Sequence, residues 1–369
     1  MAISTIDNNG ANLGQLGNRN MVTNGSMQVA QRGTSFTGVT STSAYHIDRF
    51  ETGSGDSSSQ FTVSQATAGL NGFANSLKFD CTTAQSSLGA DSRVFFQQKF
   101  EGQDLQQLKK GTSDAEKITI SFYVKSTKTG TYIVELYDND NNRQISQAYT
   151  VSSSGTWERK ILTFDGDTTG AFNNDNGLSL TLYWHLVAGS RYSSGTLSTS
   201  WTSSTDANRA VGQVNLADST NNTWEITGVQ MEVGDTATPF EHRSYGEELA
   251  KCQRYYWEAV APSQGTLGRM SYIASSTSGL ELLPMYPVPM RAAPSVSLTN
   301  PTGGWQAYRF SGAGGGHSMQ GALGGYNLNS FSGGHMWWDV NSGTPFTVGF
   351  TGRVAAISSS GAFKFDAEL

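Results

Sequence analysis

The sequence has few charged residues, no cluster of Lys and Arg, and no long apolar run. Together these shortages exclude two classes of protein, nucleic-acid-binding proteins and membrane-spanning proteins. Charged residues are 15% of the 369 residues, well under the usual quarter. Binding to nucleic acid requires clustered cations that displace counterions from phosphates, so with a net charge of −6 we expect no nucleic-acid partner. Because no apolar run approaches the roughly 18 residues that span a bilayer, we expect no membrane insertion either.

The two cysteines and five histidines show no metal-binding pattern. Cys81 lies on the apolar side of an alternating segment and Cys252 on an apolar helical stripe, so both are expected to be small buried hydrophobic residues. The histidines lack the close spacing to one another or to cysteine that zinc sites show. We therefore expect no cofactor and no metal ion.

The N-terminal region is polar and rich in Asn and Gly. Its first residues, MAISTIDNNGANLG, have neither the basic nor the apolar region of a signal peptide, so we expect a protein that is made and kept in a cytoplasm, or that leaves it by cell lysis. Residues 1–18 carry too few apolar side chains to build a core. We expect a docking arm there, and a disordered terminus is the alternative.

From residue 19 to residue 243 the apolar residues recur with a period of two, which is typical of strands with one buried and one wetter face. The segments KITISFYVKS (117–126) and LSLTLYWHL (178–186) follow this alternation strictly. Clusters of Asn, Asp, Gly and Ser between such segments indicate turns. The apolar parity shifts at Gly228, where glycine permits the backbone of a β-bulge. Several strands at this spacing predict an antiparallel, jelly-roll-like β-sandwich.

Residues 244–260 are predicted to link this sandwich to a second domain, with a helix from residue 247 to residue 258. Ser244 and Glu247 match the S-x-x-E capping box, in which each side chain satisfies the other residue's free backbone N–H. The apolar stripe of this helix would be Leu249, Cys252 and Tyr256. We interpret the helix as a strut between two β domains.

Residues 261–369 are predicted to form a second, smaller β domain with loops rich in glycine and aromatic residues. Aromatic faces suit stacking on sugar rings or on another subunit. The candidate ligand-binding residues are Trp305, Tyr308, Tyr326, Trp337 and Trp338. The alternative is burial in a small core or in a trimer interface. It is favoured because the adjacent Trp337 and Trp338 must point to opposite faces of a strand.

No catalytic signature is complete. The segment GHSMQ (316–320) has Gln320 where a nucleophile elbow has glycine. The segment DNDNN (138–142) begins like a calcium-binding loop, but Arg143 stands where that loop needs glycine. Two distant carboxylates brought together by folding would suit glycoside cleavage, and this alternative stays open. We expect a protein without catalytic residues.

The segment GVQMEVGDTATPFEHRSYGEELAKCQRYYW, residues 228–257, resembles tailed-phage virion proteins, especially tail-fibre-like proteins. Their jelly-roll domain is similar to a carbohydrate-binding module. Weaker matches, such as NRNMVTNGSMQVAQRGTSF (18–36) and the terminal FDAEL, extend the resemblance over most of the chain after residue 18. Within the main segment, Phe240 is expected to close the end of the sandwich. Glu241 and Arg243 are expected to bind each other or neighbouring backbone.

The resemblance implies a non-enzymatic virion component, a tail fibre or similar appendage located in the virion tail and synthesised in the host cytoplasm. Its implied partners are other tail proteins, further copies of the chain in a homotrimer, and host-surface polysaccharide. Related sugar-binding jelly rolls often hold calcium with acidic residues near the first and last strands, where this chain has Asn24, Ser26, Gln28 and Thr227. We therefore expect no calcium of that kind.

The alternative to a virion component is a free-standing carbohydrate-binding protein.

Overall fold

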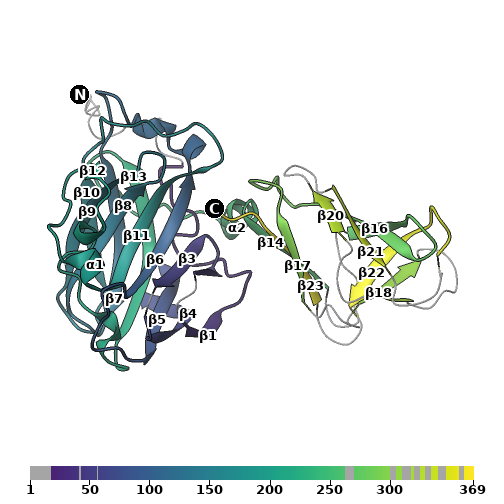
Figure 1. Cartoon of the computed structure of the whole chain (residues 1–369), viewed down its shortest axis with the longest axis horizontal. Coiled ribbons are helices and arrows are strands. Elements are labelled where there is room, and N and C mark those ends of the chain that lie inside the picture. The colour runs from purple at the N-terminus through teal and green to yellow at the C-terminus, as the bar shows by residue number, and fades with distance from the viewer. Residues whose placement is uncertain are drawn as a thin grey trace, which may run out of the picture. The chain divides into compact units, whose positions relative to one another are not determined.

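The structure is a computed structural model in which most of the chain is strand and turn (Figure 1). It describes residues 18–40, 43–55, 57–261, 270–299, 305–309, 317–319, 325–328, 334–339, 346–356 and 361–369. The chain divides between Glu248 and Leu249 into two compact units, here called the N-terminal and C-terminal units. Several antiparallel sheets and a small second unit confirm the predicted mainly β fold class.

The N-terminal unit contains two antiparallel sheets. One sheet consists of β1 (Ser35–Val39), β4 (Gln60–Leu70), β5 (Phe73–Thr83), β7 (Ile118–Ser126), β10 (Glu158–Phe164) and β13 (Thr223–Val233). The other consists of β2 (Ala44–Ile47), β3 (Phe50–Gly55), β6 (Arg93–Glu101), β8 (Gly130–Asp138), β9 (Arg143–Val151), β11 (Leu178–Ala188) and β12 (Thr202–Ser203). Their orders are β1-β4-β5-β13-β7-β10 and β12-β9-β8-β11-β6-β3-β2. The chain passes repeatedly from one sheet to the other, which is a jelly-roll-like connectivity.

Short helices lie in the connections of this unit. They are η2 (Gly102–Asp104), η3 (Gln106–Leu108), α1 (Ser190–Ser193), η4 (Asp206–Asn208) and η5 (Leu216–Asp218).

The alternating residues of the strands form the core between the two sheets, as the sequence predicted. The buried side chains are Ile118, Ile120, Phe122 and Val124 on β7, and Leu180, Leu182, Trp184 and Leu186 on β11. The rings of Phe122 and Trp184 meet edge to face, with centroids 5.7 Å apart. Each fully buried apolar side chain stabilises the fold by about 1.5–3 kcal/mol. The residues between them, such as Tyr123, are therefore directed to the outer faces.

The helix at the boundary between the units is shorter than predicted. Helix α2 spans Tyr245–Gln253, and the following strand β14 spans Tyr256–Ala261. It begins at Tyr245, two residues before the predicted start at residue 247, and the predicted cap is present, because the backbone N–H of Glu247 donates to Ser244 Oγ at 3.3 Å. The prediction of a helix to residue 258 is wrong. The aromatic residues at the start of β14 join a β-ladder, and this pairing overrides the helical spacing.

The C-terminal unit has a three-stranded sheet, β14-β23-β17, and a seven-stranded sheet, β19-β18-β22-β15-β16-β21-β20. The bounds are β15 (Met270–Ala274), β16 (Gly279–Pro284), β17 (Ser295–Leu298), β18 (Trp305–Arg309), β19 (His317–Ser318), β20 (Gly325–Leu328), β21 (Gly334–Asp339), β22 (Thr351–Ala356) and β23 (Gly361–Asp366). The paired strands run antiparallel, and aromatic side chains dominate the core of this unit.

His46 on β2 makes the stability of the N-terminal unit depend on pH. Its ring packs edge to face on Phe36, with centroids 4.9 Å apart. Burial, and then the charge of Arg32, lower the pKa of His46 from 6.5 to about 4. The unfolded chain therefore binds this proton at a higher pH than the folded chain does. As the pH falls from about 6.5 towards 4, the free energy of unfolding decreases by up to about 1.4 kcal/mol per pH unit.

We therefore expect His46→Gln to flatten the pH dependence of the free energy of unfolding in this window and to leave its slope unchanged above it. Urea unfolding of both proteins at pH values across the window measures the difference. If the two slopes agree throughout, His46 does not carry the effect.

Candidate binding site on the outer face of the sandwich

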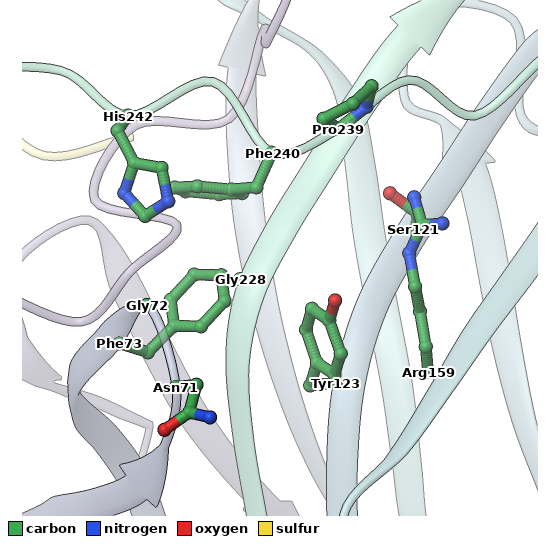
Figure 2. Close-up of a pocket in the computed structure, with 10 residues that line it drawn as sticks. All are labelled: Asn71, Gly72, Phe73, Ser121, Tyr123, Arg159, Gly228, Pro239, Phe240 and His242. Atoms are coloured by element: carbon green, nitrogen blue, oxygen red, sulfur yellow. The ribbon is translucent and has the colours of Figure 1, made fainter.

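An open pocket with a volume of about 370 Å³ lies on the outer face of the six-stranded sheet. This volume falls in the usual range for ligand pockets. Its lining residues are Asn71, Gly72, Phe73, Ser121, Tyr123, Arg159, Gly228, Pro239, Phe240 and His242. Figure 2 shows strands forming its floor, the turn between β4 and β5 at one side, and the segment 239–242 crossing above. Segments far apart in the sequence thus build one concave site.

Four rings give the pocket its apolar surface. The ring of Phe73 lies in the middle, with centroid distances of 5.4 Å to Tyr123, 5.1 Å to Phe240 and 5.3 Å to His242. Phe240 and His242 meet edge to face at 4.9 Å. The edge-to-face contacts are a preferred geometry of aromatic pairs, so the rings hold one another in place. Three of them are half-buried and His242 is exposed.

Gly228 allows these rings to approach the sheet. The pairing of β13 with β7 shifts register between Thr227 and Gln230, and Gly228 has φ +62°. The predicted bulge is confirmed. A Cβ atom at residue 228 would lie 2.7 Å from Phe73 Cζ and 3.0 Å from Tyr123 Cδ2. Glycine is required both by the backbone conformation and by the close packing of the two rings.

Hydrogen bonds hold the crossing segment over the sheet. The Gln230 side chain accepts from the Glu241 backbone N–H at 2.7 Å and donates to the Pro239 carbonyl at 3.3 Å. From β10, Arg159 Nη2 donates to the Thr238 carbonyl at 2.9 Å. Phe240 therefore lies over the outer face, and the expectation that it closes the end of the sandwich is wrong.

Glu241 and Arg243 tie the start of the described chain to this segment. The Glu241 carboxylate accepts from the backbone N–H groups of Asn18 and Asn20 at 2.7 and 2.8 Å. Arg243 Nη1 donates to the Val22 carbonyl at 3.0 Å, and its Nη2 donates to the Asn20 carbonyl. Arg243 also lies 3.4 Å from Glu241. The expectation that these two residues bind each other and neighbouring backbone is confirmed.

Two of the five aromatic residues predicted to bind ligand lie in the core of the C-terminal unit. Trp305 and Trp338 are 1% and 0% exposed. Their rings meet Phe363 at 5.1 and 5.6 Å. For these two residues the structure agrees with the favoured alternative, burial in a small core, because the alternation of β21 directs Trp338 inward and its neighbour Trp337 outward.

The other three predicted residues reach the surface at separate places. Trp337 is 41% exposed and Tyr326 44%, and Tyr308 is half-buried. Trp337 lies against Gly325, where a Cβ atom would come within 2.4 Å of the indole. Tyr326 pairs with the inward-facing Met336, so Tyr326 and Trp337 lie on opposite faces. The structure does not gather the five residues into one site, and ligand binding by these three stays a prediction.

Among the described residues, no group of three or more His, Cys, Asp and Glu side chains could hold a metal ion. At Asn24, one of the positions considered for calcium, the side-chain amide donates to the carbonyls of Val29 and Asp48 at 2.9 and 3.0 Å. Its oxygen accepts from the Val29 N–H. In the part of the chain that the structure describes, no helix has the length and apolar character required to cross a membrane.

No family model and no curated protein matches the chain. Solved structures that resemble it include the enzymatically active domain of bacteriophage CBA120 tailspike protein 4, with a TM-score of 0.31 and 14% identity over 58% of this chain and 21% of that chain. A putative sugar-binding protein from Bacteroides thetaiotaomicron has a TM-score of 0.30 and 11% identity, covering 58% of this chain and 99% of that one.

A family 11 carbohydrate-binding module from Clostridium thermocellum, in complex with a mixed-linked tetrasaccharide, has a TM-score of 0.28 and 10% identity over 57% of this chain and 98% of that one. The chain spans only about a fifth of the tailspike domain, 21%. These likenesses are weak, and the candidate site rests on the pocket geometry described above.

Proposed function

We propose that the protein binds a saccharide in the pocket on the outer face of the sandwich, without catalysis. The observation that carries this proposal is the cluster of rings from Phe73, Tyr123, Phe240 and His242 around an open cavity. The apolar face of a sugar stacks on aromatic rings, while polar groups at the rim bind its hydroxyls. Asn71 and Arg159 supply such groups on either side of the rings (Figure 2).

The composition of the lining favours binding over cleavage at this pocket. Glycoside hydrolysis commonly uses a pair of carboxylates on opposite sides of the scissile bond. The lining residues include neither Asp nor Glu. The nearby Glu232 is buried beneath the crossing segment, where it accepts from the Thr238 backbone N–H at 3.1 Å. Its carboxylate is therefore engaged in holding the fold.

The biological setting that we propose is a phage tail fibre or similar tail appendage, which assembles with other tail proteins and contacts host-surface polysaccharide. The resemblance of residues 228–257 to tail-fibre-like proteins supports it. Part of that segment builds the pocket, and its Glu241 and Arg243 fix the N-terminal stretch of the described chain. A homotrimer belongs to this proposal, and light scattering of the full chain should give the mass of three chains.

The test of saccharide binding is a comparison of variants on purified bacterial surface polysaccharides and on the cells that carry them. We expect Phe73→Ala to weaken binding by about tenfold or more, since it removes the central ring. The matched control is Tyr245→Ala, which removes a 55% exposed ring outside the pocket and should bind like the wild type. No reducing ends should be released.

A wild-type affinity for Phe73→Ala would contradict the proposal. If Trp337→Ala then abolished binding, the site would lie in the C-terminal unit instead. Unfolding curves of each variant establish that the proteins compared are folded.

A further inference from the structure

We infer that the saccharide taken by this pocket carries an anionic group, most directly the carboxylate of an acidic sugar. This inference rests on the proposed function and specifies its ligand class. Arg159 is the one Lys or Arg side chain among the described lining residues, and no carboxylate stands beside it in the lining. The chain as a whole has a net charge of −6, so this local excess of positive charge is a property of the pocket.

Arg159 is positioned for a ligand by the fold. It projects from β10 on the outer face of the sheet, and Figure 2 shows its guanidinium across the pocket from the rings of Phe73 and Phe240. The hydrogen bond from Nη2 to the Thr238 carbonyl, 2.9 Å long, fixes its direction. The guanidinium has five donors in a planar fork that matches a carboxylate, so most of its donors stay available at the rim.

Several other arginines of the N-terminal unit are paired with carboxylates of the protein itself. Arg143 lies 2.7 Å from Asp167, and Arg191 lies 2.9 Å from Asp91. Within the described part of the chain, Arg159 has no carboxylate within 4 Å. No described acidic side chain thus neutralises its charge. An anion placed against the rings would provide the missing partner.

The remaining rim groups suit the same ligand. The Asn71 amide and the His242 imidazole both supply N–H donors, and both residues are exposed. Charge-assisted hydrogen bonds are roughly twice as strong as neutral ones. A sugar ring lying on Phe73 with an acidic substituent towards Arg159 would therefore bind more tightly than its neutral counterpart.

The test uses matched pairs of oligosaccharides that differ in charge, titrated by calorimetry into the chain of 369 residues. The pairs are sialyllactose with lactose, and trigalacturonate with galactotriose; sulfated lactose distinguishes a sulfate from a carboxylate. In the wild type we expect the acidic member of at least one pair to bind at least about tenfold more tightly than the neutral member of the same pair. The preference should shrink at high salt, because an exposed ion pair is screened.

Arg159→Gln should bring the acidic and neutral members to nearly equal affinity, and Arg159→Lys should retain part of the preference. The control is Lys117→Gln, which removes a 51% exposed cation outside the lining and should change nothing. Arg159 is exposed and contributes one of several hydrogen bonds that hold the crossing segment, so both variants should unfold nearly like the wild type and keep the wild-type affinity for the neutral members.

Equal affinity for the acidic and neutral members in the wild type, with both weakened by Phe73→Ala, would overturn this inference and leave the proposed function standing. Preference for sulfated lactose alone would support an anionic ligand and overturn the assignment of a carboxylate. Failure of every oligosaccharide and surface polysaccharide to bind would overturn both proposals.

Discussion

Replacing Arg209 by leucine is expected to lower the free energy of unfolding of the N-terminal unit by about 3–5 kcal/mol. Arg209 Nε and Nη2 donate to the two carboxylate oxygens of Glu135 at 2.9 and 3.0 Å. Glu135 is fully buried, and His185 Nε2 lies 2.9 Å from the same carboxylate. Burial alone would raise the pKa of Glu135, but Arg209 and His185 together hold it below its usual value.

The large effect follows because the substitution leaves a buried carboxylate without its main partner. Burial first, and the charges of Arg209 and Arg93 with it, lower the pKa of His185 against the opposing effect of Glu135, so Arg209 carries the positive charge beside Glu135 in the wild type near neutral pH. The carboxylate must then stay ionised in an apolar setting or take up a proton, and both cost free energy.

Two controls separate this account from a general sensitivity to losing arginine. Arg191→Leu removes an arginine that is 55% exposed, together with its ion pairs to Asp91 and Asp206, and it should leave the unfolding midpoint nearly unchanged. The double variant Glu135→Leu/Arg209→Leu removes both buried charges and should recover much of the loss. Urea unfolding measures all three, and a similar midpoint for Arg209→Leu and Arg191→Leu would refute the account.

Arg243→Leu is expected to lower the free energy of unfolding by about 2–5 kcal/mol. The Arg243 side chain is 4% exposed, lies 3.6 Å from the buried Glu248 and donates to the carbonyls of Asn20 and Val22. Without it, the two carbonyl groups lose this donor, and Glu248 loses its cationic neighbour and keeps the hydrogen bond from the Asn24 backbone N–H. The segment around residues 18–24 should then open more often than the sheets.

Hydrogen exchange locates this second effect. Amide protons of residues 20–24 should exchange faster in Arg243→Leu, while those of the core strands β7 and β11 should show only the global change. Arg243→Lys should recover part of the stability, because an ammonium retains the charge but lacks the planar fork that reaches both carbonyls. A stability loss with unaltered exchange at residues 20–24 would show that Arg243 does not hold this segment.

Features encoded over a few neighbouring residues were predictable from the sequence. The alternation on β7 and β11 correctly assigned the buried face, the glycine at residue 228 marked a real bulge, and Ser244 marked the start of α2. The end of that helix was not predictable, since Tyr256 continues the helical spacing of Leu249 and Cys252, whereas Tyr256–Ala261 pair with a distant strand. Long-range pairing decided between two locally acceptable structures.

The pocket was not predictable from the sequence for the same reason. Its rings come from a turn near residue 73, from β7, and from the segment before α2, and no local spacing links them. Tyr123 on the outer side of an alternating strand and Phe240 beside a proline were visible separately, without a sign that they meet. Conversely, Trp305 and Trp338 lay near glycine-rich sequence, yet their large apolar rings are used to fill the core of a small unit.

The most direct test of the central claim, that the sandwich pocket holds a saccharide, is a crystal structure of the full chain with the tightest-binding oligosaccharide from the titrations. We predict a sugar ring in van der Waals contact with Phe73 and Phe240, with its acidic substituent beside Arg159. A saccharide ordered on Trp337 or elsewhere, with this pocket unfilled, would contradict the claim.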